Sequence, residues 1–450
     1  MKTAYKGIIL FVLLVLIGVF LLAASLFLPK GVIHNNVYFS VDTFNNEMDL
    51  PRSIPDYPMS MLDNNTDAWM LLIADYHASD GSLADQLFLG QYAVYDENKS
   101  GLVGMDSIGS LQAEEVLRVG EYPRYWHGWL FPLRLSLCLF NYSGIRMMNV
   151  VILTVLFAIT VMSIERTKQR ETLIPFLISF AILMPAALPL CMAYMISTCI
   201  ALIASALILQ YRERIDALIG IRLYFMLIGA ITAYSEFLQF PLITLGFPLV
   251  FLLAVRGKAQ SSKRDIMDTF LCVFAWGCGY FGMWAAKWLL ASLFTSRNVI
   301  KDAIHQISIR FSCTGDGQTD MTISRIDAVI RNLEVLNRRP VILMLLSSTV
   351  FYTIRLICLQ VLPEPNEKKT IAIQRIAPFL LLSLLPFVWI LLLANHSYIH
   401  FHFTYRVFSV TVFAFLSGLS ILSMHDTRET RVINGGMLET PIRKNGSQYD

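Results

Sequence analysis

Residues 122–129 read Tyr-Pro-Arg-Tyr-Trp-His-Gly-Trp and close a polar segment that begins at Pro29 and ends near Arg146. This segment separates the first apolar run of the chain, residues 8–28, from the second. Each run is long enough to cross about 30 Å of hydrocarbon as a helix. Because similar apolar runs fill most of the remaining chain, the pattern predicts an all-α polytopic membrane protein with one large loop near its N-terminus.

The composition agrees with a membrane protein. Hydrophobic residues make up 55% of the chain and charged residues only 15%, whereas a soluble domain carries about 25% charge. The net charge of +3 is too small and too dispersed to suggest a nucleic-acid partner. The seven cysteines show no metal-ligand spacing, and no nucleotide-binding glycine motif occurs. A reaction driven by a cytoplasmic nucleotide is therefore not expected.

The apolar runs predict about ten transmembrane helices. Residues 1–28 hold the first, residues 146–294 hold the second to the seventh, and residues 340–424 hold the last three. Residues 29–145 form the large loop, residues 295–339 form a second, amphipathic polar segment, and residues 425–450 form a polar tail. Within the large loop, helical spacing of apolar residues predicts helices in residues 61–78 and 111–119. Residues 129–140 are too short to cross and predict an interfacial helix.

Basic residues orient the predicted helices. Residues 165–170 and the other short loops assigned to one side carry Lys and Arg, whereas the tips near Pro185 and Glu236 carry none. Cytoplasmic loops of membrane proteins are enriched in Lys and Arg. We therefore expect a multi-pass protein of the cell membrane with both termini cytoplasmic. The large loop, residues 295–339 and residues 395–406 would then share the outer face.

Four acidic residues on that outer face are candidate catalytic groups: Asp42, Asp63, Asp67 and Glu236. Asp63 and Asp67 are four residues apart, so they share one face of a predicted helix. Paired carboxylates can act as a general base or bind a divalent cation, although no cofactor is required by the sequence. Asp63 equally fits a helix N-cap, and Glu236 fits a simple turn residue.

Cationic and aromatic residues supply the candidate substrate-binding groups. Arg124, Tyr125, Trp126 and His127 could hold a lipid-linked phosphate at headgroup depth, or could simply form an aromatic belt at the membrane surface. Lys287 interrupts an apolar run, where it could extend to the headgroups or meet a phosphate inside the bundle.

A second basic group, with His396, His400 and Arg406, lies in residues 395–406. No local structure aligns all three histidines of this stretch, so no metal site is expected there. Contact with a phosphate or a sugar is the better interpretation.

Three short stretches carry a family resemblance: residues 125–128 (Tyr-Trp-His-Gly), residues 234–241 (Tyr-Ser-Glu-Phe-Leu-Gln-Phe-Pro), and residues 395–400 with 404–406. They look like a group of little-characterised polytopic membrane proteins, often from Gram-positive bacteria. The layout as a whole resembles the GT-C class of membrane glycosyltransferases. That resemblance implies sugar transfer from a polyprenyl-phosphate donor on the outer face, with an acid of the first loop activating the acceptor and basic residues holding the donor phosphate. The first loop lacks an Asp-x-Asp or Glu-x-Asp motif, however.

The sequence thus predicts an integral membrane glycosyltransferase that acts in cell-surface glycan synthesis or modification. Its partners would be the membrane lipid, a polyprenyl-phosphate sugar donor and a glycan or lipid-linked acceptor. A polysaccharide polymerase or ligase is one alternative, and we would expect its dominant loop late in the chain. A transporter or flippase of lipid-linked saccharides is another, and it would place broken helices near the membrane midplane. A non-catalytic assembly protein is a third.

Overall fold

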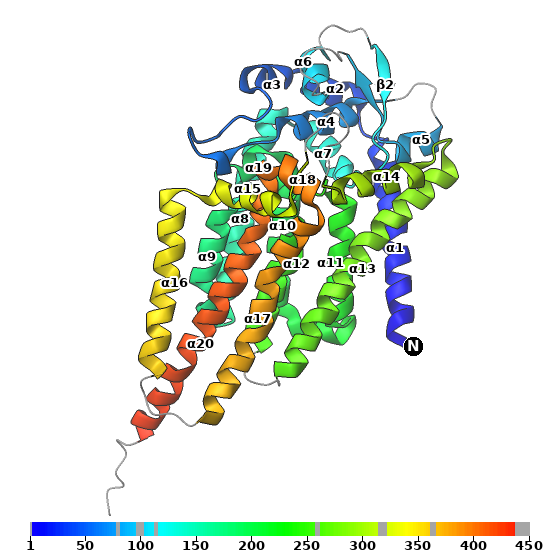
Figure 1. Cartoon of the computed structure of the whole chain (residues 1–450). Helices are drawn as coiled ribbons and strands as arrows, with labels where there is room; N and C mark the ends of the chain where they lie inside the picture. Colours follow the sequence, from blue (N-terminus) through cyan, green and yellow to red (C-terminus); the bar gives the residue numbers. More distant parts are fainter. Residues whose placement is uncertain are drawn as a thin grey trace, which may run out of the picture.

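The computed structural model describes residues 2–77, 82–95, 103–111, 116–256, 262–313, 322–360 and 366–436, and they are mostly helical (Figure 1). Six segments are long and apolar enough to cross a membrane. They lie in α1 (Lys2–Ser25), α8 (Tyr142–Arg166), α10 (Met192–Leu218), α13 (Ser262–Phe294), α16 (Arg339–Gln360) and, with the turns just before it, α20 (Phe408–Gly436). Shorter apolar helices accompany them: α9 (Leu173–Ile182), α11 (Ile221–Ser235), α12 (Leu242–Arg256) and α17 (Asn366–Leu392). These helices form a bundle, as expected for an all-α membrane protein.

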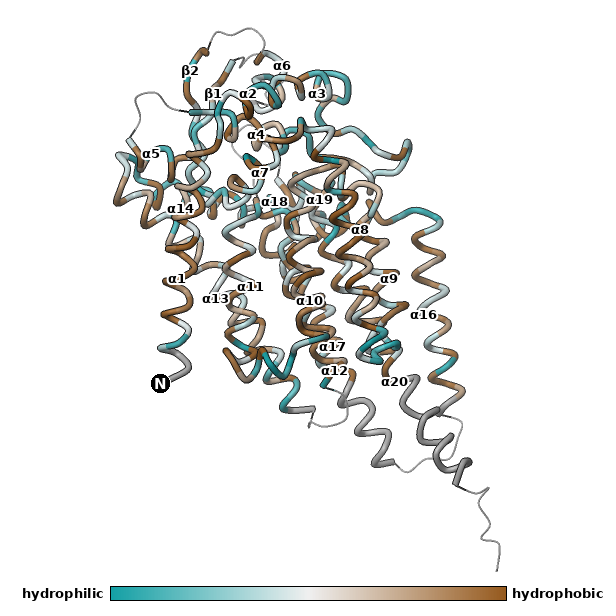
Figure 2. The backbone as a smooth tube through the Cα atoms, turned by 180° about the vertical axis from the view of Figure 1, so that it is seen from behind, coloured by the Kyte–Doolittle hydropathy of each residue, from teal (hydrophilic) through white to brown (hydrophobic). Residues whose placement is uncertain are grey.

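The polar segment after α1 folds into a head that covers one end of the bundle, opposite the N-terminus (Figure 1). The head comprises α2 (Lys30–Tyr38), α3 (Val41–Glu47), α4 (Asn64–Asp75), α5 (Leu83–Phe88), α6 (Val103–Gly109), α7 (Leu130–Leu137) and the antiparallel strands β1 (Tyr92–Val94) and β2 (Arg118–Gly120). Hydrophobic residues dominate the bundle, whereas the head is mixed (Figure 2). The helix predicted for residues 111–119 is wrong where the structure describes it, because residues 118–120 pair with β1.

Four helices lie between the head and the bundle (Figure 1). They are α14 (Val299–Phe311), α15 (Arg325–Leu336), α18 (Ala394–Ile399) and α19 (Phe401–Thr404). We call this layer the junction. It contains the described helices of residues 295–339 and 395–406, the two segments predicted to share the outer face with the large loop. At the other end of the chain, α20 continues to Gly436 through residues predicted to be a tail, and residues 437–450 lie outside the described part.

Arg134 fixes the head to α1. This residue of α7 is only 2% exposed. Its guanidinium donates hydrogen bonds to the carbonyl oxygens of Ala74 and Tyr76, at 2.9 and 3.0 Å, and to Ser25 Oγ at 3.2 Å. The last carbonyls of a helix have no partner within that helix, so Arg134 satisfies the end of α4 while joining it to the end of α1. The predicted helix is present, but its charge faces the protein interior.

Asp67 fixes the head to α10. Its carboxylate accepts hydrogen bonds from the backbone N–H groups of Met192 and Ala193, at 2.7 and 3.1 Å, and from Tyr142 Oη at 2.6 Å. A carboxylate at a helix N-terminus satisfies free N–H groups and meets the positive end of the helix dipole. Beside it, Arg146 pairs with Glu47 through two hydrogen bonds. A buried polar network therefore holds α4 against α8 and α10.

Glycines allow α11 and α13 to pack closely. A Cβ atom on Gly279 would lie 1.9 Å from the carbonyl oxygen of Met226, and one on Gly229 would lie 2.1 Å from that of Trp276. Small residues let helices approach where the hydrophobic effect gives little drive for association. This contact sets the position of α13, which forms one wall of the site described next.

Candidate functional site

Residues 236–241 connect α11 to α12 and form a buried turn that we call the tip. Glu236 is 2% exposed, and its carboxylate accepts hydrogen bonds from Tyr280 Oη at 2.6 Å and from the backbone N–H of Gln239 at 2.9 Å. Leu238 adopts a left-handed conformation with φ of 64°. The tip is therefore an ordered structure in which Glu236 holds its own turn and α13 together.

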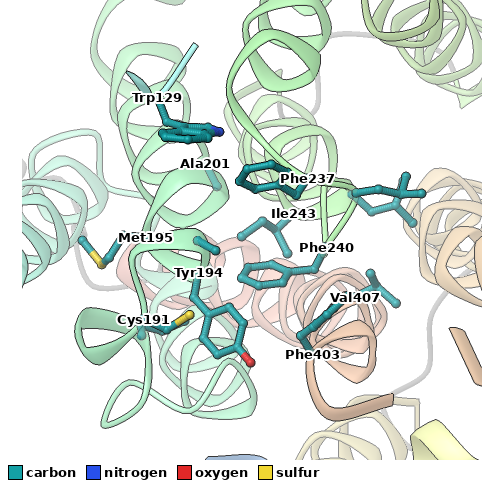
Figure 3. Packing of buried hydrophobic residues seen from close by; sticks show 14 of the residues in the cluster. Trp129, Cys191, Tyr194, Met195, Ala201, Phe237, Phe240, Ile243, Phe403 and Val407 are labelled. Carbon is teal, nitrogen blue, oxygen red and sulfur yellow. The ribbon is translucent and has the colours of Figure 1, made fainter. Parts of the chain in front are cut away.

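Residues 125–128 and 395–400 both contact the tip. Phe237 packs on Tyr125, with ring centroids 5.4 Å apart. It also packs on Trp129, and Phe240 packs on Tyr194 (Figure 3). His396 Nε2 donates to the carbonyl oxygen of Leu238 at 2.8 Å. Residues from distant parts of the chain therefore contact one another at this end of the bundle.

A cavity of about 220 Å³ lies beside the tip, beneath α14. In Figure 1, α13 leans away from α17 toward the head, and α14 crosses back over the space between them. The walls of the cavity are largely aromatic and aliphatic: Tyr125, Leu238, Phe281, Trp284, Trp288, Ala303, Ile307, Phe311, Trp389, Leu392 and Leu393. The polar members are Arg124, Gln306 and Arg310. Phe281 and Leu392 are 55% and 48% exposed, so the cavity reaches the lateral surface of the bundle.

Two guanidinium groups give the cavity a positive wall. Arg124 is held by Asp302 of α14, with Nη1 3.1 Å from Oδ2, and the Trp288 indole donates to its carbonyl oxygen at 3.0 Å. Burial alone would lower the pKa of Arg124, but Tyr122, Tyr125 and Asp302 raise it overall. Arg310 forms no ion pair with a carboxylate among the described residues, and its charge acts on Tyr125, Tyr280 and His396. An apolar cavity with a guanidinium that has no carboxylate partner in the described part of the chain suits an amphiphilic anion.

Glu236 is the predicted acid that lies nearest this cavity. Its carboxylate interacts electrostatically with Tyr125, which lines the wall. Burial raises the pKa of Glu236 to about 7, and the hydrogen bonds from Tyr280 and from the backbone of Gln239 and Leu238 oppose that rise. A carboxyl group that titrates near neutral pH can take up a proton and release it again.

The other predicted acids lie elsewhere in the head. Asp42 is exposed on α3. Asp63 caps α4, as its sequence position allows, by accepting from the Thr66 N–H at 3.0 Å, and it also accepts from Gln239 Nε2 at 3.3 Å. Asp67 is fully buried at the start of α10, and burial raises its pKa to about 6 against the hydrogen bonds that it accepts. None of the four predicted acids is itself part of the cavity wall, and Glu236 is connected to it through the wall residues Leu238 and Tyr125.

Most of the predicted cationic and aromatic groups make structural contacts instead. The Trp126 indole donates to Met283 O at 2.6 Å, and Lys287 Nζ donates to Phe88 O at 2.7 Å. His127 Nε2 lies 2.8 Å from Tyr122 O. Burial, together with the charge of Lys287, lowers the pKa of His127 to about 3. The Trp126 and Lys287 contacts tie the head to α13, and the His127 contact lies within the head. Only Arg124 and Tyr125 of this group line the cavity.

The basic residues of the stretch 395–406 also make structural contacts, and none of them lines the cavity. Arg406 is 0% exposed and donates to the carbonyl oxygens of Leu183, His402 and Met59. His396 serves the tip, and burial lowers its pKa well below the usual value. Its ring lies 4.8 Å from that of His400. Within the described residues, no three His, Cys, Asp or Glu side chains gather into a group that could hold a metal ion.

Arg310 and the tryptophans of the wall were not among the predicted site residues. Arg310 belongs to the segment predicted to be amphipathic, and Trp284 and Trp288 are one helical turn apart on the apolar run that contains Lys287. Those patterns were visible, but their meeting depends on how α13, α14 and α17 pack. Compared with known proteins, the chain matches no family model, no curated protein and no solved structure.

Proposed function

We propose that this protein is a membrane glycosyltransferase that binds a polyprenyl-phosphate-linked sugar in the cavity beneath α14. The observation that carries the proposal is Arg310, a guanidinium without a carboxylate partner among the described residues, in the wall of a tryptophan-lined cavity. A phosphate would pair with the guanidinium through charge-assisted hydrogen bonds. The apolar walls would contact the first part of the lipid, and the lateral opening would admit it from the bilayer.

The wall also carries donors that a sugar phosphate could use. Arg124 Nε, Trp284 Nε1 and Trp389 Nε1 have no hydrogen-bond partner in the described part of the chain. Buried donors without acceptors are rare because each costs free energy. Phosphate oxygens and sugar hydroxyls would supply acceptors, and the indole rings offer flat apolar faces for a sugar ring. The cavity chemistry therefore favours a ligand with an anionic, oxygen-rich end.

Glu236 is the proposed general base. Its carboxylate would take the proton from the acceptor hydroxyl as that oxygen bonds to the anomeric carbon, while the bond from this carbon to the phosphate oxygen breaks. The lipid phosphate would leave with its negative charge held by Arg310 and Arg124. Attack on the face opposite the leaving group would invert the anomeric configuration. The base must be ionised, so its pKa of about 7 places the useful range at neutral pH and above.

Replacing Glu236 with Gln tests this role. We expect the rate of transfer to fall about 10²- to 10⁴-fold, the range for losing a general base, with lipid-phosphate binding unchanged. In the unaltered protein the rate should rise with pH and level off above about 7, since only the ionised carboxylate accepts a proton. The variant should lose that rise. Consumption of a polyprenyl-phosphate sugar by membranes containing the protein measures both the rate of transfer and its dependence on pH.

Asp327→Asn provides the matched control, because Asp327 is an exposed carboxylate on α15. It should leave the rate and its pH profile unchanged. If Glu236→Gln keeps the full rate while the protein remains folded, Glu236 is not the base. If both variants lose activity equally, the effect comes from general charge at the junction.

We extend this proposal to the membrane topology of the chain. Each of the ten apolar runs overlaps a helix of the bundle, and six of these helices hold a segment long and apolar enough to cross a membrane. We propose that the four shorter helices cross as well, with both termini cytoplasmic and the head outside the cell membrane. The cavity lies at the head end of α13 and α17, under α14. A flippase would need a pathway through the midplane, so the position of the cavity favours transfer at the outer surface in cell-surface glycan synthesis.

A further inference from the structure

An aromatic stripe runs along one face of α13. Phe270, Phe274 and Phe281 are 55%, 70% and 55% exposed. At 100° per residue, these side chains and Trp288 all project within about 40° of one another. The stripe from residue 270 to residue 288 is about 27 Å long at 1.5 Å per residue. We call these four residues the α13 track.

The track is continuous with the cavity. Phe281 and Trp288 are both part of the cavity wall, and Trp288 is fixed there by its hydrogen bond to Arg124 O. Phe274 and Phe270 extend the same face toward the opposite end of the bundle. On α17, Leu384 and Val388 are exposed at 56% and 48%, and with Leu392 they form a parallel stripe that also ends in the cavity wall. A chain that leaves the cavity laterally therefore meets the α13 track on one side and the α17 stripe on the other.

A single row of rings suits a single chain. The four rings form a single row along the helix. The cavity of about 220 Å³ leaves little room beyond a head group and the start of a tail. Exposed apolar side chains are normal on a membrane helix, and α16 shows them too, with Phe351 54% exposed. What distinguishes α13 from α16 is that its exposed rings lead into the cavity wall that contains Arg310, whose guanidinium has no carboxylate partner among the described residues.

We propose that the α13 track binds the tail of one long polyisoprenoid chain whose phosphate lies at Arg310. This inference rests on the proposed function. It adds that the protein selects its lipid by the length and the chemical type of the tail. Methyl-branched isoprene units make repeated dispersion contacts with ring faces, each small but additive along the helix. A lipid with two acyl chains would fit a single row less well.

Binding of two probes to the purified full-length protein in detergent tests the track. Geranyl phosphate reaches the cavity only, whereas undecaprenyl phosphate also reaches the track. We expect the long probe to bind about 10-fold more tightly. Phe274→Ala should reduce that advantage about 3- to 10-fold and leave geranyl phosphate binding unchanged, because packing contacts alone hold a tail in an apolar medium. Phe351→Ala on α16 is the control and should alter neither.

The outcomes separate the two proposals. If geranyl phosphate fails to bind, the proposed function fails at the cavity. If geranyl phosphate binds and the long probe binds no more tightly, or if Phe351→Ala acts as strongly as Phe274→Ala, the track is overturned and the cavity stands. Equal binding of a phosphatidic acid with two acyl chains would also overturn the selection for one isoprenoid chain.

Discussion

Arg310→Ala should abolish most of the affinity of the protein for geranyl phosphate. In an apolar cavity, a charge-assisted hydrogen bond contributes about 1.5–3 kcal/mol, so the dissociation constant should rise about 10- to 100-fold. The dissociation constant of Arg310→Lys should lie between those of the unaltered protein and Arg310→Ala, because lysine keeps the charge but lacks the bidentate geometry of the guanidinium. Titration calorimetry on the detergent-solubilised protein measures all three dissociation constants.

Lys301→Ala is the matched control for Arg310. Lys301 lies on the same helix but is exposed, and it is not part of the cavity wall. Its removal changes the charge of α14 by the same amount, and binding should stay as it was. Excess inorganic phosphate should displace geranyl phosphate only weakly, because it gains nothing from the tryptophan walls. Unchanged binding by Arg310→Ala would show that the phosphate lies elsewhere.

Asp67→Ala should strongly destabilise the fold. The substitution leaves the Met192 and Ala193 N–H groups and the Tyr142 hydroxyl without their acceptor, and it removes a negative charge near Arg146. Breaking such a buried network by removing one member costs about 3–5 kcal/mol. Thermal unfolding of the solubilised protein, followed by intrinsic fluorescence, should show a large fall in the midpoint temperature.

Two other substitutions define the cause of that fall. Asp67→Asn keeps one oxygen acceptor but places an amide N–H among donors, so its midpoint should lie between those of Asp67→Ala and the unaltered protein. Asp42→Ala removes an exposed acid from α3 and should leave the midpoint unchanged. A normal midpoint for Asp67→Ala would contradict the structural role given to this carboxylate and return it to the list of catalytic candidates.

The helices could be predicted from the sequence because a membrane crossing needs a continuous apolar stretch with internally satisfied backbone groups. Each predicted apolar run overlaps a helix of the bundle, six of these helices hold a segment long and apolar enough to cross, and the Asp63 cap follows from local chemistry alone. The predicted helix at residues 111–119 failed because those residues pair with a distant strand. Local apolar spacing cannot reveal a partner that lies more than twenty residues away.

The roles of the charged groups could not be predicted in the same way. Lys287 and Arg406 look like phosphate ligands in the sequence. In the structure, however, Lys287 donates to the carbonyl oxygen of Phe88 and Arg406 donates to that of Met59, both far away in the sequence. Arg310 looks like an ordinary surface charge of an amphipathic helix. Only the packing of α14 over α13 and α17 turns it toward a cavity. The residue types were informative, but their partners are set by tertiary structure.

Photo-crosslinking tests the central claim, a lipid-phosphate site beneath α14, most directly. A polyprenyl phosphate with a diazirine on its first isoprene unit would be incubated with the protein in vesicles, irradiated, and mapped by peptide mass spectrometry. We predict labelling of residues 281–311 and 389–393, which contain most of the cavity wall, and its loss with excess unlabelled lipid. Labelling spread over α1 and α16, or labelling that unlabelled lipid does not reduce, would contradict the account.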